Sequence, residues 1–497
     1  MAFARTSGTG LTAGAAVLVC VLAACGSEVA PDNFNGVSGS ALSGGDAAAG
    51  AGTTPGTSTP AGDAGDGTST STGGGTTATG DSSGSTGGTG TTGGGTGSTG
   101  GTGSTGGSHD AGSGGTTGVK AGSCDGFSNG PGITDDTITI ATAADVSGAV
   151  PNVFKSAFDA MNAYVAYFNA TSDICGRKLA LQTYDSGLSA GGSHDASEAA
   201  CDSAFALVGS MSAFDSGGAD VTEACGQPDI RNTAVEKARQ DAATSFAVTV
   251  VDTDHMFLQP WVWAKSQFGD DIKDSAFVYL NAGASVGISQ AIMAGTEKLG
   301  YDWKQVIVVD INSVPNWNAY ANQLKAAGIE FVQTNLASYT VKLKAAMEQA
   351  DYHPTFMGDG SAYDSKLIAD SSMADVMEGA YLFTQSALIE EAAKNPEMQT
   401  YIDWLARVGG DDPNPMGAAS WAAGELFTQL AVQLGGKLTR ESLIAAIKQV
   451  HQFDGNKIIA PADPGAKVTG KCVTVLQIKG GAFTRVTPYP YTCGPLA

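Results

Sequence analysis

The sequence predicts an α/β protein with two doubly wound parallel-sheet lobes that follow a disordered Gly/Ser/Thr linker. From residue 121 onward, apolar runs typical of strands alternate with apolar residues at helical spacing, and the alternation starts again near residue 275. Strands that alternate with helices form parallel βαβ units with right-handed crossovers. The stretch from residue 121 to residue 497 is long enough that two lobes are expected.

The first series of elements opens with a predicted strand at residues 137–141. The helix that follows, at residues 151–169, carries Val153, Ala157 and Met161 at helical spacing. The remaining elements of this series are a strand at 178–184, a short helix at 197–202, and strands at 204–209, 229–231 and 246–250.

The second series repeats the same alternation. Its predicted strands lie at residues 275–280, 305–309, 329–333, 354–358 and 379–383. Its predicted helices lie at residues 285–299, 317–327 and 336–350. Gly300 follows the first of these helices, at a position where glycine commonly ends a helix.

Three late helices and a hairpin complete the predicted elements. The helices, at residues 396–408, 420–434 and 440–450, are expected to return to the first lobe, because the second series already closes its own sheet. The tail predicts a hairpin of strands at 472–478 and 482–486 that turns at Lys479-Gly480-Gly481. The predicted lobes are residues 121–251 with 376–450, the N-terminal lobe, and residues 252–375 with 451–497, the C-terminal lobe.

The start of the chain predicts export. Arg5 precedes an apolar run from Leu11 to Val21, and Leu22-Ala23-Ala24-Cys25 follows. This order is typical of a secretory signal, and the run is too short for a permanent membrane span. The cysteine after small residues resembles the lipobox of bacterial lipoproteins, which implies a signal peptide at residues 1–24 and a lipid anchor on Cys25. The alternative is an ordinary signal peptide with an incidental cysteine.

Residues 25–120 are predicted to form a lipid-anchored, low-complexity linker. Between residues 38 and 118 the chain is nearly all Gly, Ser, Thr, Ala and Asp, which offer too little apolar surface to form a core. We expect a flexible tether, which could also be O-glycosylated. The formal net charge of −23 argues against nucleic acid as a partner.

Six cysteines follow the anchor, and an even number in an exported protein indicates three disulfides with 15 possible pairings. These residues are Cys124, Cys175, Cys201, Cys225, Cys472 and Cys493. Local loop closure favours Cys201–Cys225 and Cys472–Cys493, which leaves Cys124–Cys175. No C-x-x-C or C-x-x-H spacing is present, so no metal site is predicted.

Sequence motifs give little indication of an enzyme. The histidines are scattered, and the globular part contains no G-x-S-x-G elbow, no P-loop and no G-x-G-x-x-G after a strand. The turn Gly358-Asp359-Gly360-Ser361 is superficially similar to a hydrolase turn, but its serine has no histidine partner visible in the sequence. We therefore predict a protein that is not an enzyme and has no cofactor.

Small polar residues follow several of the predicted strands, at the ends where open parallel sheets bind their ligands. The candidates are Ser210 and Ser212 after the third strand, Asn232 and Thr233 after the fourth, and Ser285 and Asp359 in the second series. The carboxylate of Asp359 suits a ligand ammonium. Helix capping is the alternative role for the serines and for Asp359.

Several segments of the chain stand in a characteristic order. They are residues 133–140, Gly176-Arg177-Lys178-Leu179 with Asp185, residues 317–328, residues 437–441 and Phe453-Asp454-Gly455, while Cys201 and Cys225 bracket the third strand. This ordered set resembles the Leu/Ile/Val-binding branch of the type I periplasmic binding proteins that serve ABC importers. In that family a disulfide brackets the third strand in much the same way, and residues 133–140 resemble the opening strand. The resemblance covers nearly all of residues 133–493.

The resemblance implies a small ligand held between two lobes. The ligand's carboxylate would meet the loop of Ser210 and Ser212 and the loop of Asn232 and Thr233, and Asp359 would take the ammonium.

Two loops depart from the family pattern. The first loop keeps Ser147-Gly148, with Ser147 as a further ligand-binding candidate, but lacks the usual Pro-Leu form. The second-lobe loop has Ser285-Val286-Gly287 where an aromatic residue is common. These departures allow a larger or less polar ligand than a standard amino acid.

The sequence thus predicts a monomeric, lipid-anchored solute-binding protein on the extracytoplasmic face of the cell membrane. We expect it to close two lobes over an amino acid, an amide or a related compound and deliver it to an ABC permease. The alternatives are a ligand-sensing receptor lipoprotein without transport and a wall-associated adhesin or spacer.

Overall fold

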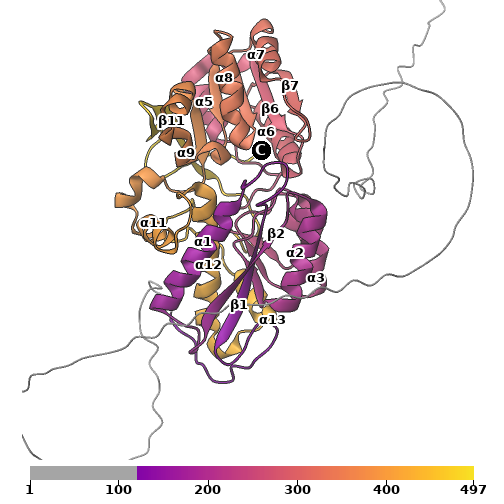
Figure 1. Ribbon diagram of the computed structural model, residues 1–497, viewed down its shortest axis with the longest axis vertical. Coiled ribbons are helices and arrows are strands. Elements are labelled where there is room, and N and C mark those ends of the chain that lie inside the picture. Colours follow the sequence, from indigo (N-terminus) through magenta and orange to yellow (C-terminus); the bar gives the residue numbers. More distant parts are fainter. Residues whose placement is uncertain (1–119) are drawn as a thin grey trace, which may run out of the picture. The chain divides into compact units, whose positions relative to one another are not determined.

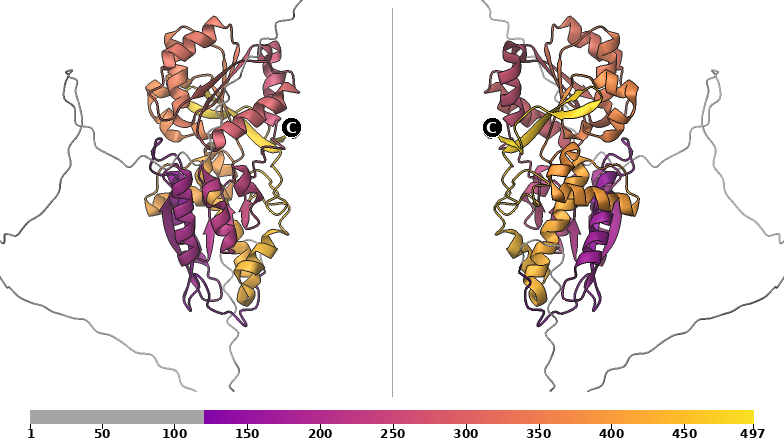
Figure 2. Two further views of the ribbon diagram at one scale, coloured as in Figure 1. Left: turned by 90° about the vertical axis from the view of Figure 1, so that its right-hand side faces the viewer. Right: turned by 90° about the vertical axis from the view of Figure 1, so that its left-hand side faces the viewer.

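The computed structural model describes residues 120–497, which form two α/β lobes (Figures 1 and 2). The predicted signal peptide, the lipid anchor at Cys25 and nearly all of the predicted linker lie outside the described residues. Within residues 120–497, every helix is too short or too polar to cross a membrane.

The first lobe is built on a five-stranded parallel sheet with the order β2-β1-β3-β4-β5. Because the strand order reverses direction at β1, the sheet is doubly wound, as predicted. Its strands are β1 (Thr137–Ala144), β2 (Lys178–Asp185), β3 (Ala206–Val208), β4 (Asp229–Arg231) and β5 (Ser245–Ala247).

Helices from both ends of the described chain cover this sheet, and α1 and α12 lie side by side in Figure 1. The late helices therefore return to the first lobe, as predicted. The helices of this lobe are α1 (Lys155–Thr171), α2 (Ala190–Ser203), α3 (Ala219–Ala224), α4 (Lys237–Asp241), α11 (Pro396–Val408), α12 (Pro415–Leu434) and α13 (Arg440–Ile447). Short 3₁₀ turns are η2 (Asp215–Gly218), η6 (Ile389–Lys394) and η7 (Gly435–Lys437).

Helix α12 is the central helix of the first lobe. Its start is set by Asn414, whose side chain accepts a hydrogen bond from Gly417 N at 2.9 Å, and by a proline in the first turn. Nearly all of its side chains are buried, because it is apolar around its whole circumference. Gly424 lets α1 approach, since a Cβ there would lie 2.6 Å from the ring of Tyr164.

The second lobe contains a larger mixed sheet with the path β12-β11-β10-β9-β8-β6-β7. Five of these strands are parallel, and the predicted C-terminal hairpin adds β11 and β12 in antiparallel pairing. The strands are β6 (Ser275–Leu280), β7 (Trp303–Val309), β8 (Phe331–Asn335), β9 (Thr355–Gly358), β10 (Tyr381–Thr384), β11 (Cys472–Lys479) and β12 (Ala482–Arg485), and β13 (Thr492–Cys493) pairs with β11 off this path.

The helices of the second lobe cover both faces of its sheet. They are α5 (Gln259–Phe268), α6 (Ala284–Glu297), α7 (Trp317–Ala326), α8 (Thr340–Gln349), α9 (Ser365–Ala369) and α10 (Ser371–Met377). The 3₁₀ turns are η3 (Gly269–Lys273), η4 (Ala337–Tyr339) and η5 (Gly360–Ala362).

The chain passes between the lobes three times, after β5, after β10 and before β11. Figure 2 shows the result for the yellow C-terminal part, whose helices lie in the first lobe and whose strands lie in the second. Two of the connecting segments pair at Ser386 and Ile459, and Asp252 N donates to Thr469 Oγ1 at 2.8 Å. The three connections are therefore tied to one another.

Strand and core membership differ from the predicted lobe boundaries in two places. β10 is hydrogen-bonded in the second sheet, although residues 376–450 are predicted to belong to the first lobe. Phe453, Ile458 and Ile459 lie in the core of the first lobe, although residues 451–497 are predicted to belong to the second. Because these crossings fall in short apolar segments, no break in periodicity marks them.

Several helix predictions are also corrected. The short helices α3, α4, α9 and α10 are not predicted, because they have too few turns for a clear helical period. α5 is as long as α7 and α8 but is not predicted either, because its consecutive apolar residues show no helical period. α2 begins at Ala190 rather than near residue 197, since Ser189 caps it and accepts from Gly192 N at 3.0 Å.

The three disulfides are Cys124–Cys175, Cys201–Cys225 and Cys472–Cys493, as local loop closure favours. The second of these joins the end of α2 to the residue that follows α3. Arg440 of α13 reinforces this region, because its guanidinium donates to the carbonyl oxygens of Cys201, Ala204, Phe205 and Cys225 at 2.7–3.1 Å.

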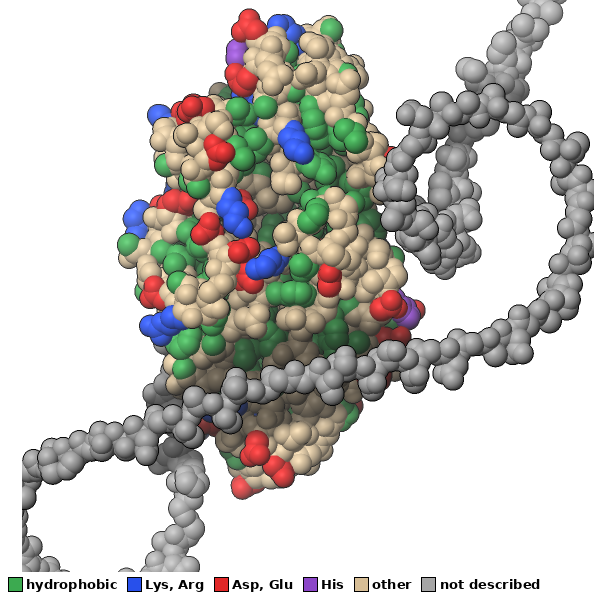
Figure 3. Space-filling view, viewed as in Figure 1, with side chains coloured by type: hydrophobic (Ala, Val, Ile, Leu, Met, Phe, Trp, Pro, Cys, Tyr) green, Lys and Arg blue, Asp and Glu red, His purple; other side chains and the backbone are tan. Residues whose placement is uncertain are grey.

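Acidic and basic side chains are interspersed over the face of the molecule seen in Figure 3. This face therefore presents no extended patch of positive charge of the kind that binds a polyanion.

A candidate ligand-binding site between the lobes

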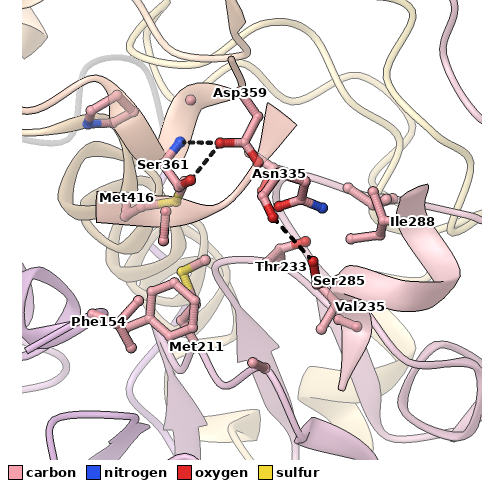
Figure 4. Close-up of a pocket in the computed structure, with 18 of the residues that line it drawn as sticks. Phe154, Met211, Thr233, Val235, Ser285, Ile288, Asn335, Asp359, Ser361 and Met416 are labelled. Carbon is pink, nitrogen blue, oxygen red and sulfur yellow. Dashed lines mark hydrogen bonds between the residues drawn. The ribbon is translucent and has the colours of Figure 1, made fainter. Parts of the chain in front are cut away.

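A cavity of about 250 Å³ lies between the two lobes, at the carboxyl ends of their parallel strands (Figure 4). Side chains of both lobes line it, as expected where two doubly wound sheets face each other. From the first lobe come residues that follow β1, β3 and β4, together with the start of α12. From the second lobe come residues of α6 and residues that follow β8, β9 and β10.

The cavity wall is mainly apolar. Phe154, Met211 and Met416 come from the first lobe, and Ile288 comes from the second (Figure 4). Among the described residues that line the cavity, there is no Lys, Arg or His, and Asp359 is the one ionisable side chain. The wall therefore suits a ligand with a large apolar part.

Five of the seven predicted ligand-binding residues line the cavity. They are Ser212, Asn232, Thr233, Ser285 and Asp359. Ser147 and Ser210 lie outside the wall, which corrects their predicted position.

Ser147 and Ser210 instead organise the loops behind the cavity. Ser210 is buried, and its hydroxyl accepts a hydrogen bond from Ala143 N at 3.0 Å. Ser147 is exposed, and its backbone N–H donates to both carboxylate oxygens of Asp185 at 3.1 Å. Although burial raises the pKa of Asp185, hydrogen bonds from Ser147, Val146 and Gly187 lower it to about 2.

Asp145, which was not among the predicted site residues, holds the loop after β3. Its buried carboxylate accepts hydrogen bonds from Ser186 Oγ at 2.6 Å, Leu188 N at 3.1 Å, Ser212 Oγ at 3.0 Å and Ala213 N at 2.7 Å. Four donors satisfy this buried charge. The hydroxyl of Ser212 is thereby committed to another residue of the protein.

Asp215 holds the loop after β4 in a similar way. It accepts from Val235 N at 2.9 Å and from Glu236 N at 3.1 Å. Burial raises the pKa of Asp215 to about 6, against the lowering effect of the nearby Arg231 and Arg239.

Asn232 and Thr233 both line the cavity, but only the side chain of Asn232 is hydrogen-bonded to other described residues. The Asn232 amide donates to Met416 O at 2.6 Å and to Ser420 Oγ at 3.0 Å, which fixes the start of α12 against the end of β4. The buried hydroxyl of Thr233 has no hydrogen-bond partner among residues 120–497. This hydroxyl is therefore available to a ligand.

In the second lobe, Asp359 caps η5 and also faces the cavity (Figure 4). One of its oxygens accepts from Ser361 N at 3.1 Å and from Ser361 Oγ, and the other accepts from no other described residue. Burial raises the pKa of Asp359, and the hydrogen bonds from Ser361 partly counter this. Nearby, Ser285 Oγ donates to the carbonyl oxygen of Asn335 at 3.4 Å.

The lobes also touch each other around the cavity. Ala284 N, at the start of α6, donates to Ala213 O of the first lobe at 2.9 Å. At the rim, Lys366 Nζ of α9 lies 3.3 Å from Asp411 Oδ2 of the first lobe. The structure therefore shows the two lobes in contact, with the cavity between them.

The apolar part of the wall was missed at the sequence level. Phe154, Met211, Ile288 and Met416 carry no motif, and apolar residues near strand ends are most often assigned to a core. Met211 alone offers a signal, since it lies between two serines in a loop that has no strand or helix to bury it.

Two doubly wound lobes, tied by three connections and enclosing one apolar cavity, define a two-lobed solute-binding protein. The family model described as "Periplasmic binding protein" matches residues 137–482, and the chain belongs to this family, with the type I fold. Proteins of this family bind solutes outside the cytoplasm and are not enzymes. A comparison with curated proteins gives no significant match.

Solved structures share the fold at low sequence identity. A fatty acid ABC transporter substrate-binding protein from Thermomonospora curvata has a TM-score of 0.64 at 17% identity and covers 74% of this chain and 96% of its own. A leucine-binding protein from Thermotoga maritima has a TM-score of 0.58 at 16% identity, covering 70% and 98%. A solute-binding protein from R. palustris in complex with benzoate has a TM-score of 0.60 at 14% identity, covering 73% and 97%.

Proposed function

We propose that this protein captures a mainly apolar small molecule outside the cytoplasm and delivers it to an ABC importer. The observation that carries the proposal is the apolar cavity between the lobes, which both lobes line. A ligand that contacts both lobes stabilises the closed arrangement, because the open arrangement loses half of these contacts. The three tied connections are suited to act as the hinge.

The lining chemistry favours a less polar ligand than the amino acid or amide expected from the sequence. Fatty acid and benzoate, which name two of the similar structures, also have large apolar parts, and this likeness supports an apolar ligand body and not the nature of its polar group. We propose that the protein acts as a monomer and that its closed form is what the permease recognises.

A screen of thermal stability tests the proposed binding. A matching apolar ligand at 100 times its Kd should stabilise the protein by about 2.7 kcal/mol and raise Tm by roughly 3–4 °C. Ile288→Asp should abolish this shift, because it places a charge in the apolar wall without a partner. Val314→Asp is the matched control, since Val314 is 98% exposed and lies outside the cavity. A shift that survives Ile288→Asp unchanged would place the binding elsewhere.

We also propose that Cys25 carries the lipid that keeps the protein at its membrane. The proposal is supported by the lipobox-like Leu22-Ala23-Ala24-Cys25 and by the extracytoplasmic location of the family. Cys25→Ala should move most of the protein from the membrane fraction to the medium or periplasm, because the acylated thiol is lost. Its ligand-induced Tm shift should be unchanged. Retention of the variant on the membrane would contradict lipid anchoring at this residue.

A further inference from the structure

Most of the first-lobe donors in the loops that line the cavity are already bound to groups of the protein itself, and the Thr233 hydroxyl is the exception. Asp145 accepts hydrogen bonds from Ser212 Oγ at 3.0 Å and from Ala213 N at 2.7 Å. Asp215 accepts hydrogen bonds from Val235 N at 2.9 Å and from Glu236 N at 3.1 Å. Backbone N–H groups at such loop and helix starts are the groups that hold an anionic ligand in other proteins. A ligand carboxylate at these donors would have to displace a buried, hydrogen-bonded carboxylate.

The surroundings of the cavity offer an anionic ligand no counter-charge. Its described lining residues include no basic side chain. The nearby cations are already paired: Arg231, which donates to Thr233 O, lies 3.1 Å from Asp229, and two lysines line an adjoining pocket. Lys155 lies 2.6 Å from Asp159, and Lys366 lies 3.3 Å from Asp411. The one lining charge is the carboxylate of Asp359, which repels a second carboxylate in a site of low dielectric.

Asp359 has the opposite effect on a cation. One of its oxygens is bound by Ser361, and the other accepts from no other described residue. In Figure 4, Asp359 lies on the same side of the cavity as Asn335 and Ser285, whereas Phe154 lies across from them. An ammonium at this end meets a carboxylate oxygen that accepts from no other described residue, and the opposite end accommodates an apolar group.

We infer that the ligand is an apolar amine that carries no carboxylate, with its ammonium at Asp359 and its apolar body against Phe154, Met211 and Met416. This inference rests on the proposed solute-binding function and names its substrate class. It differs from the expectation for an amino acid, because Asp145 already binds the donors of the Ser212 loop and leaves only the Thr233 hydroxyl for a ligand carboxylate.

Four probes that share one apolar body test the inference on the full mature chain. We expect 2-phenylethylamine to bind about tenfold or more tightly than 3-phenylpropanoate and L-phenylalanine in titration calorimetry. 3-Phenylpropanoate has no ammonium to donate to Asp359, and L-phenylalanine carries an additional carboxylate that Asp359 repels. The neutral analogue 2-phenylethanol should fall between the amine and the acid.

Asp359→Asn removes the negative charge of the site and keeps the shape of the side chain. The variant should lower the affinity for 2-phenylethylamine by about tenfold and change that for 2-phenylethanol by less than about twofold, because asparagine keeps the cap on η5. Asp364→Asn is the control, since Asp364 caps the neighbouring α9 and lies outside this cavity.

The outcomes distinguish the inference from the proposed function. Tighter binding of 3-phenylpropanoate or L-phenylalanine than of the amine overturns the inference and leaves the solute-binding function standing. The same holds if Asp359→Asn leaves amine affinity unchanged. Binding by none of the four probes overturns the inference, and the solute-binding function then depends on the wider thermal screen.

Discussion

Gly283→Ala should weaken ligand binding by about tenfold or more while the protein still folds. Gly283 precedes α6 and has a φ of +39°, and a Cβ on it would lie 2.1 Å from Ala213 O of the opposite lobe. The next residue, Ala284, donates its N–H to that same oxygen at 2.9 Å. A methyl group at this point therefore holds the lobes apart where they should meet, and the closed form loses stability relative to the open form.

Titration calorimetry with a ligand from the thermal screen measures this effect, and Gly287→Ala is the matched control. Gly287 lies in α6, and a Cβ added there meets nothing within 4 Å. The control should keep wild-type affinity and gain about 0.5–1 kcal/mol of stability, because alanine favours helix. Equal affinities for the two variants would show that contact at Gly283 does not control closure.

The parallel strands are the most predictable part of the fold. β1, β2, β4 and β6 fall within a few residues of their predicted ranges. β6 is an apolar run that the sheet buries on both faces, whereas the edge strand β2 is predicted by its alternation and buries only Leu179. The short helices are less predictable. α5 contains the consecutive apolar residues Trp261, Val262 and Trp263, which show no helical period, and tertiary packing rather than propensity forms it.

The binding site is predictable only in part. Topology places Ser212 and Thr233 at the carboxyl end of the first sheet and Asp359 at the carboxyl end of the second, and these two ends face each other across the cavity. Topology does not show which donors remain free, because this depends on hydrogen bonds between residues far apart in sequence. Asp145 and Ser212 are separated by 67 residues. The Ser212 hydroxyl is expected to bind a ligand carboxylate, and it instead donates to the carboxylate of Asp145.

Two neighbouring carboxylates in the first lobe, the buried Glu425 and the half-buried Glu397, lead to a second large effect. Glu425 of α12 accepts hydrogen bonds from Gln429 Nε2 at 2.8 Å and from Asn456 Nδ2, and its other oxygen is buried without a partner among the described residues. Glu397 of α11 accepts from Trp421 Nε1 at 2.7 Å. Burial raises the pKa of both groups, and the charges of Glu397 and Asp454 raise the pKa of Glu425 further.

Glu425→Gln should therefore increase the free energy of unfolding at pH 8 by about 1–3 kcal/mol. Because the folded-state pKa lies above the unfolded value of 4.5, the folded protein binds the proton more tightly. The stabilisation from this group is complete below about pH 4.5 and is lost as the pH rises through the folded pKa. Glutamine resembles the protonated acid and cannot ionise, so the variant escapes that loss.

Urea unfolding at pH 5 and pH 8 measures the difference, with Glu441→Gln as the control. The exposed Glu441 has a lowered pKa, because hydrogen bonds from its own backbone N–H and from Thr439 favour its charged form. The control should therefore show a small loss of stability toward pH 8, opposite in sign to the effect at Glu425. The two glutamates differ because Glu425 is buried without a full set of hydrogen-bond partners, whereas Glu441 is exposed. A Glu425→Gln variant that is less stable than wild type at pH 8 would mean that the ionised pair is held by contacts stronger than its desolvation.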